Sequence, residues 1–174
     1  MTIDERMVRY TGRLSFLQFI RNKPAQFGIK IFILADSFSG YVYNWKVYTG
    51  ADGARRNSQN NNWNDLAISS QRNQRTNHAY KIVAELTNIL ANRNHIVSFD
   101  SFYSYLNVVK HLARKGIGSV GTLDKRRRLM PQDIKNPNAN MGLRETIFRR
   151  SENIMTLVFK DKKFVRIITN VHGN

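Results

Sequence analysis

The feature that most constrains the fold is a short β-branched segment between two stretches with helical periodicity. Residues 94–100 include the β-branched run Ile96-Val97-Ser98-Phe99. Apolar residues recur at helical spacing before this segment, over 79–90, and again after it, over 102–113. A short β-branched run between two helices is typical of a buried parallel strand. The pattern therefore predicts a sheet with two helices packed on it.

Strand-like patterns account for much of the remaining chain. We expect strands at 2–10, 28–37, 40–48 and 117–122, and a hairpin formed by 153–159 and 164–169. A helix between antiparallel strands and a later strand makes a right-handed crossover the expected connection. The fold class predicted is α/β, with a mixed β-sheet and flanking helices.

The organisation predicted is a single domain over residues 1–174, with no internal repeat. A polar, Asn-rich segment at about 51–75 has the composition of a solvated insertion. A second polar stretch, from Lys125 to about Arg150, begins with four consecutive basic residues and is expected to be an excursion from the sheet.

The charge balance indicates a polyanionic partner. The sequence has 28 Lys and Arg against 12 Asp and Glu, a net charge of +16, and its pI is about 10.6. Such a charge favours nucleic acid, by release of counterions, or acidic lipid. We favour nucleic acid because the sequence has no long basic amphipathic helix with exposed large apolar residues.

Several classes of protein and site are excluded by composition. The chain contains no cysteine, which removes disulfides, thiolate zinc sites and cysteine nucleophiles. The first six residues include two acids and no apolar signal segment. The longest uncharged apolar run, 31–35, is far shorter than the roughly 20 residues of a membrane helix. We expect an intracellular protein that neither spans a membrane nor is secreted.

Two aspartates lie where strands of the predicted sheet carry them. Asp4 is in the first strand, and Asp100 ends the buried parallel strand. If these strands are neighbours, the two carboxylates meet at one edge and offer the hard oxygen ligands that magnesium prefers. A lone Asp at a strand end is more often a turn or cap residue, and spacing alone leaves both interpretations open.

The basic run and the tryptophans are weaker candidates for nucleic-acid contact. Lys125, Arg126, Arg127 and Arg128 suit a phosphate contact or a nuclear localisation patch, and a solvated loop is an equal alternative. Trp63, in the Asn-rich segment, is expected to be exposed and able to stack on bases, whereas Trp45 is expected to pack within a strand. The four histidines show no metal-ligand spacing, so packing or surface roles are expected.

A series of short motifs resembles the piggyBac-type transposase domain. The motifs, in chain order, are Asp4–Met7, Gly12-Arg13, Asn22–Pro24, Phe27–Phe32, Asp36, Gly40-Tyr41, Tyr48–Gly50, Phe99–Ser104, Leu112, Gly116, Gly121-Thr122, Pro131 and Ile168–Asn170. Apart from the segment at 51–75, the resemblance covers nearly the whole chain.

The resemblance implies a ribonuclease H-like fold and a three-aspartate, magnesium-dependent DNA strand-transfer site. The family's first catalytic, metal-binding aspartate falls on Asp4 and its second on Asp100. Its third lies beyond the terminal hairpin, and no residue of 1–174 matches it. We therefore expect a truncated domain, incomplete at its C-terminal side, that binds DNA without efficient cleavage. Two departures from the family pattern are Ser101, where Asn is usual, and Asp124, where a basic residue is common.

Three functions are compatible with this sequence. The first is that of a transposase fragment deficient in strand cleavage and transfer. The second is a domesticated, non-enzymatic DNA- or chromatin-binding protein that keeps the scaffold for its charge, and the third is a degenerate remnant without a selected role. The expected location is the nucleus and the expected partner is DNA, with self-association or binding to a full-length transposase as further options.

Overall fold

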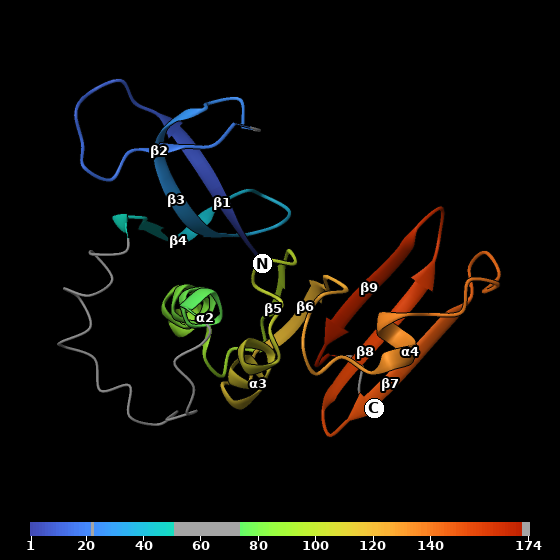
Figure 1. The fold of residues 1–174 in the computed structure, drawn as a ribbon. Helices are drawn as coiled ribbons and strands as arrows, with labels where there is room; N and C mark the ends of the chain where they lie inside the picture. The colour runs from blue at the N-terminus through green and yellow to red at the C-terminus, as the bar shows by residue number, and fades with distance from the viewer. Residues whose placement is uncertain (22, 51–73, 172–174) are drawn as a thin grey trace.

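In the computed structural model, residues 1–21, 23–50 and 74–171 are described, and they form a mixed sheet with two main helices (Figure 1). The Asn-rich segment, including Trp63, lies outside the described residues. The strands are β1 (Thr2–Arg9), β2 (Gln18–Phe19), β3 (Phe27–Ala35), β4 (Val42–Val47), β5 (Ile96–Phe99), β6 (Gly118–Thr122), β7 (Thr146–Ser151), β8 (Ile154–Lys160) and β9 (Phe164–Thr169). The helices are α2 (Gln74–Thr87), η3 (Asn88–Leu90), α3 (Leu106–Arg114) and α4 (Gln132–Lys135).

The sheet has two parallel pairs at its centre. The strand order is β2-β3-β1-β5-β6-β9-β8-β7, and β4 pairs with β3 on the same side as β2. β5 runs parallel to β1 and to β6, whereas the pairs of β3 with β1 and with β4 are antiparallel. The order β4-β3-β1-β5-β6, with β3 reversed, is that of a ribonuclease H-like sheet, which confirms the predicted fold class.

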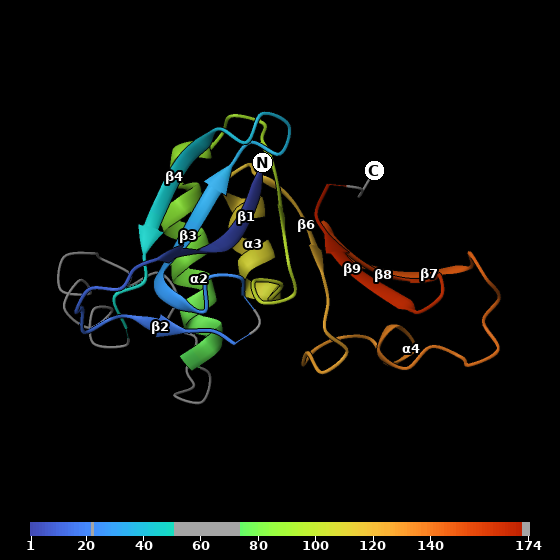
Figure 2. The same ribbon diagram turned by 90° about the horizontal axis from the view of Figure 1, so that it is seen from above.

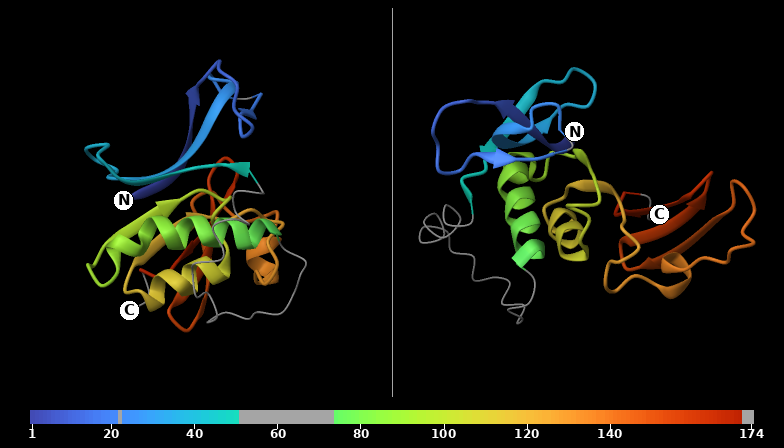
Figure 3. Two further views of the ribbon diagram at one scale, coloured as in Figure 1. Left: turned by 90° about the vertical axis from the view of Figure 1, so that its left-hand side faces the viewer. Right: turned by 45° about the horizontal axis from the view of Figure 1, so that its top comes forward.

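Helices α2 and α3 lie side by side on one face of this sheet (Figure 2 and Figure 3). The sheet face beneath them is apolar because alternate strand residues such as Ile3, Phe32 and Val97 point toward the helices and are almost fully buried. The helical spacing in the sequence is confirmed, since Ile82, Leu86, Val109 and Leu112 are buried against those strands. None of the described helices is long and apolar enough to cross a membrane.

Two helix boundaries differ from the sequence prediction. The stripe over 79–90 ends in a 3-10 turn, which leaves Ile89 43% exposed. Residues 102–105, expected to be helical, form a turn between β5 and α3. The end of α3 is as predicted, because Gly116 adopts a positive φ of 66°, which favours glycine.

Strands β7, β8 and β9 form a wing that extends the sheet away from α2 and α3 (Figure 1). The predicted terminal hairpin is confirmed as β8 and β9, but the sequence pattern missed β7, which adds a third antiparallel strand. The wing has its own small cluster of buried residues, Met130, Ile134 and Val158. Arg166 fixes α4 over the wing by donating from Nε to the carbonyl of Ile134 at 2.9 Å and from Nη2 to that of Lys135 at 3.0 Å.

Candidate functional site

Asp4 lies in β1, and Asp100 directly follows the last residue of β5, the strand that runs parallel to β1. β1 and β5 pair in parallel, with Thr2 opposite Ser98 and Ile3 opposite Phe99. One step further along this register brings Asp4 level with Asp100, on strands spaced about 4.8 Å apart. Both aspartates are exposed to solvent. The pairing of β1 with β5 therefore brings the backbone of Asp4 near that of Asp100 at the end of β5, and a shared metal site there stays a prediction.

A nearby backbone N–H donates a hydrogen bond to one carboxylate oxygen of each aspartate. Asp4 Oδ1 accepts a hydrogen bond from the N–H of Glu5 at 2.7 Å. Asp100 Oδ1 accepts one from the N–H of Phe102 at 2.9 Å. Among the described residues, the Oδ2 atoms have no hydrogen-bond or ion-pair partner in the protein. Asp100 is thus a turn residue, as one interpretation expected, and still presents an oxygen to an external ligand.

The turn that follows Asp100 packs closely on β6. The Asp100 carbonyl accepts hydrogen bonds from Ser104 Oγ at 2.9 Å and from the Tyr103 N–H at 3.2 Å. A Cβ atom at Gly121 would lie 2.4 Å from both a Phe99 ring carbon and Ser104 Oγ. Glycine is therefore required at this position of the Gly121-Thr122 motif so that the turn can approach the strand.

Tyr103 lies beneath the carboxylates and was missed as a site residue at the sequence level. Its side chain is fully buried, and its hydroxyl has no hydrogen-bond partner among the described residues. Burial raises the pKa of this hydroxyl well above its usual range, and the negative charges of Glu5, Asp100 and Asp4 raise it further. Tyr103 therefore remains a neutral donor near the three acids.

The basic run Lys125–Arg128 begins just after β6, and its four side chains differ in exposure and in their partners. Lys125 and Arg128 are exposed, as expected of phosphate contacts. Arg126 is also exposed but pairs with Asp124, at 2.6 Å between Nη2 and Oδ2. Hydrogen bonds from the Arg126 side chain and backbone hold the pKa of the Asp124 carboxyl far below its usual range.

Arg127 turns inward, which corrects the solvated-loop alternative for this one side chain, whereas its expected nucleic-acid contact stays a prediction. Its guanidinium carbon lies 3.6 Å from the centroid of the Tyr105 ring. Its Nη2 donates hydrogen bonds to the carbonyls of Ser101 and Phe102. Trp45 is a second correction, because it lies in β4 as predicted but is 60% exposed instead of packed.

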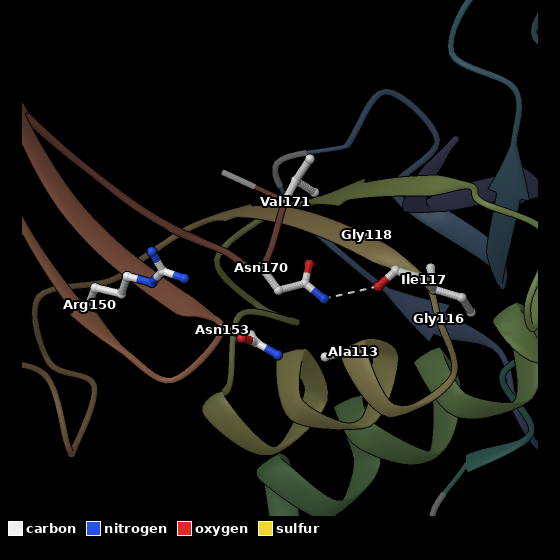
Figure 4. A pocket seen from close by; sticks show the side chains of 8 residues that line it. All are labelled: Ala113, Gly116, Ile117, Gly118, Arg150, Asn153, Asn170 and Val171. Atoms are coloured by element: carbon white, nitrogen blue, oxygen red, sulfur yellow. Dashed lines mark hydrogen bonds between the residues drawn. The ribbon is translucent and has the colours of Figure 1, made fainter. Parts of the chain in front are cut away.

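A cavity of about 330 Å³ lies at the other end of β6, away from the carboxylates (Figure 4). Its polar lining includes Arg150, Asn153 and Asn170. Asn170 already bridges β9 to β6, because its Oδ1 accepts from the Ser119 N–H and its Nδ2 donates to the Ile117 carbonyl at 3.0 Å. These hydrogen bonds give Asn170, the last residue of the Ile168–Asn170 motif, a structural role. The cavity is separate from the candidate site.

The donors at the site suit a hard divalent cation. Magnesium in proteins is commonly held by one or two carboxylates together with water and substrate phosphates, and Asp4 and Asp100 supply two. Within residues 1–21, 23–50 and 74–171, no group of three or more His, Asp or Glu side chains is arranged to hold a metal ion. A magnesium site at Asp4 and Asp100 therefore stays a prediction.

Comparison with known proteins agrees with the fold described above. In a cryo-EM structure of a piggyBac transposase synaptic complex with hairpin DNA, the transposase has a similar fold, with a TM-score of 0.79 and 22% sequence identity. The alignment covers 99% of this chain and 33% of that chain, so this chain spans about a third of its length. A family described as Transposase IS4 matches residues 1–174. Because that match extends over the whole chain, the protein belongs to the Transposase IS4 family.

Proposed function

We propose that residues 1–174 act as a DNA-binding part of a piggyBac-type transposase core, in which Asp4 and Asp100 supply two carboxylates of a magnesium-dependent strand-transfer site. The observation that supports the proposal is the parallel pairing of β1 with β5, in which Ile3 lies opposite Phe99 and the next residue of each segment is Asp4 and Asp100. Carboxylates fixed by a rigid sheet are suited to holding ligands in a defined geometry.

The residues around the carboxylates have separable tasks in this proposal. Asp4 and Asp100 would hold magnesium, each with the carboxylate oxygen that no described residue occupies. The bound cation would supply activation of the attacking oxygen, from water or a 3′-hydroxyl, and stabilisation of the leaving oxygen of the phosphodiester. Lys125 and Arg128, exposed on the loop that follows β6, bind backbone phosphates of the DNA. The net charge of +16 adds attraction that does not depend on base sequence.

We further propose that these residues alone are deficient in strand cleavage. The described part of the chain groups no third acid with Asp4 and Asp100 in a metal site. Two carboxylates can hold one cation weakly, with water completing its coordination, but in-line displacement is fastest when two cations clamp both oxygens. DNA binding has no such requirement, because it depends on the basic surface.

The experiment is a strand-cleavage assay beside a DNA-binding assay. The unmodified chain, Asp4→Ala and Asp100→Ala are incubated with DNA carrying the ends of the related transposon, in magnesium or manganese. We expect all three to bind DNA at low salt and none to cleave above background. Cleavage by the unmodified chain that both substitutions abolish would show that the proposed deficiency is wrong and that a further ligand is present. Loss of DNA binding in all three proteins at low salt would contradict the proposal as a whole.

A further inference from the structure

Arg127 reaches from the basic loop to the turn that carries Asp100. Its Nη2 donates to the carbonyl oxygen of Ser101 and, at 3.3 Å, to that of Phe102. Its guanidinium stacks on the Tyr105 ring, 3.6 Å from the ring centroid. Its Nε is buried and has no partner among the described residues. The guanidinium is therefore committed to this turn and is not available to solvent in the way that Lys125 and Arg128 are.

A single peptide unit connects Arg127 to the Asp100 carboxylate. The carbonyl of Ser101, which accepts from Arg127, and the N–H of Phe102, which donates to Asp100 Oδ1 at 2.9 Å, belong to the same peptide group. A peptide group is planar, so fixing the direction of its oxygen also fixes the direction of its N–H. A charged donor on the oxygen also polarises the group and strengthens the hydrogen bond made by the N–H.

We propose that Arg127 is a positioning residue that orients the Asp100 carboxylate through the peptide group between Ser101 and Phe102. The proposal rests on the proposed function for the role of Asp100 as a metal ligand, but the orientation itself does not depend on that role. It also assigns two tasks to one loop, because Lys125 and Arg128 face outward toward phosphate whereas Arg127 faces the site.

The geometry requires arginine. Two neighbouring carbonyls and the face of a ring are engaged together by one planar group, which a lysine ammonium cannot reproduce. Lysine at this position keeps the charge and most of the aliphatic stem, so it separates orientation from electrostatic attraction to DNA. A DNA-contacting role for Arg127 predicts that lysine is tolerated, whereas a positioning role predicts that it is not.

The test compares Arg127→Lys and Arg127→Met with the matched control Arg128→Lys on the outward side of the loop. The first readout is hydrogen exchange of the Phe102 amide, measured by NMR. The second is affinity for manganese at the aspartates, measured by paramagnetic broadening. We expect Phe102 exchange about tenfold faster and manganese affinity about tenfold weaker in both Arg127 variants, similar to the loss of other groups that orient metal ligands. Arg128→Lys should match the unmodified chain in Phe102 exchange and in manganese affinity, and Arg127→Lys should keep its DNA affinity.

Each outcome bears on the proposal. Unchanged Phe102 exchange in a folded Arg127→Lys would overturn it, and so would manganese affinity equal to that of the unmodified chain. If the unmodified chain binds no manganese, the proposed metal site fails, and Phe102 exchange alone then decides whether Arg127 orients Asp100. If Arg127→Met unfolds, as thermal unfolding would show, Arg127→Lys carries the comparison because it preserves charge and most of the volume.

Discussion

The strand-borne carboxylates and the basic loop lie at the same edge of the sheet but are held in different ways. Asp4 lies in β1 and Asp100 directly follows β5, and both strands pack on α2 and α3 through the hydrophobic core. Lys125 and Arg128 lie in a loop with exposed side chains, anchored mainly by the inward Arg127. The comparison teaches that the acidic part of the site is determined by the core, whereas the basic part depends on a few local contacts.

The largest effect expected from this comparison is on stability. Leu112 is fully buried beneath the sheet, so Leu112→Ala should lower the free energy of unfolding by about 2–5 kcal/mol because it leaves a cavity. Leu129, in the basic loop, is 85% exposed, and Leu129→Ala should change that free energy by less than about 0.5 kcal/mol. Chemical denaturation of both variants measures the difference. Equal losses would show that the loop is as much a part of the core as α3.

The next effect concerns the dependence of DNA affinity on salt. Because phosphate contacts release counterions, affinity should fall about a hundredfold or more between 50 and 200 mM salt, with little dependence on DNA sequence. Fluorescence anisotropy with two unrelated duplexes measures both properties. An affinity that is the same at low and high salt would contradict an electrostatic mode of binding.

Removing charges from the basic loop and from the two aspartates should change DNA affinity in opposite directions. Lys125→Ala combined with Arg128→Ala should weaken DNA binding about five- to tenfold and reduce the salt slope by about 2, since two phosphate contacts are lost. Asp4→Asn combined with Asp100→Asn should strengthen binding a few-fold in the absence of divalent cations, because two negative charges near the phosphates are removed. Unchanged binding in the aspartate variant would place the DNA away from the carboxylates.

The smallest effect is a pH dependence of the core behind the carboxylates. Burial lowers the pKa of His78 and of His111 below the usual value of 6.5; nearby Lys charges lower that of His78 further, and Lys115 and Arg114 lower that of His111. Below that pH the unfolded chain binds more protons than the folded one, so stability should fall as pH decreases through about 6.5. His111 also pairs with the Tyr80 hydroxyl at 2.9 Å. His111→Gln should therefore flatten a plot of Tm against pH between 5.5 and 7. An unchanged slope would show that His111 does not contribute to the pH dependence of stability.

Much of the fold could be predicted from the sequence where elements are regular and half-buried. The central strands and the two helices follow from apolar periodicity. The strand β2 could not, because its two residues are strand only through pairing with β3. The strand β7 could not either, because it lies at the outer edge of the wing and most of its side chains are exposed, which leaves no alternation to detect.

The candidate site, like the fold, could be predicted only in part from the sequence. The strand positions of Asp4 and Asp100 made them candidates, although spacing alone left a turn role open for each. Their common level depends on the pairing register of β1 with β5, which no local pattern encodes. The inward turn of Arg127 depends on the Tyr105 ring and on carbonyls 25 and 26 positions earlier in the chain. A run of four basic residues carries no information about which one turns inward.

The most direct test of the central claim is a manganese titration followed by NMR. If Asp4 and Asp100 share a cation, paramagnetic broadening should begin at the amides of residues 3–5 and 99–102, and magnesium should reverse it. Asp4→Asn and Asp100→Asn should each abolish this broadening while the fold is retained. Broadening that is centred elsewhere, or that persists in both variants, would contradict the assignment of these two aspartates as a metal site.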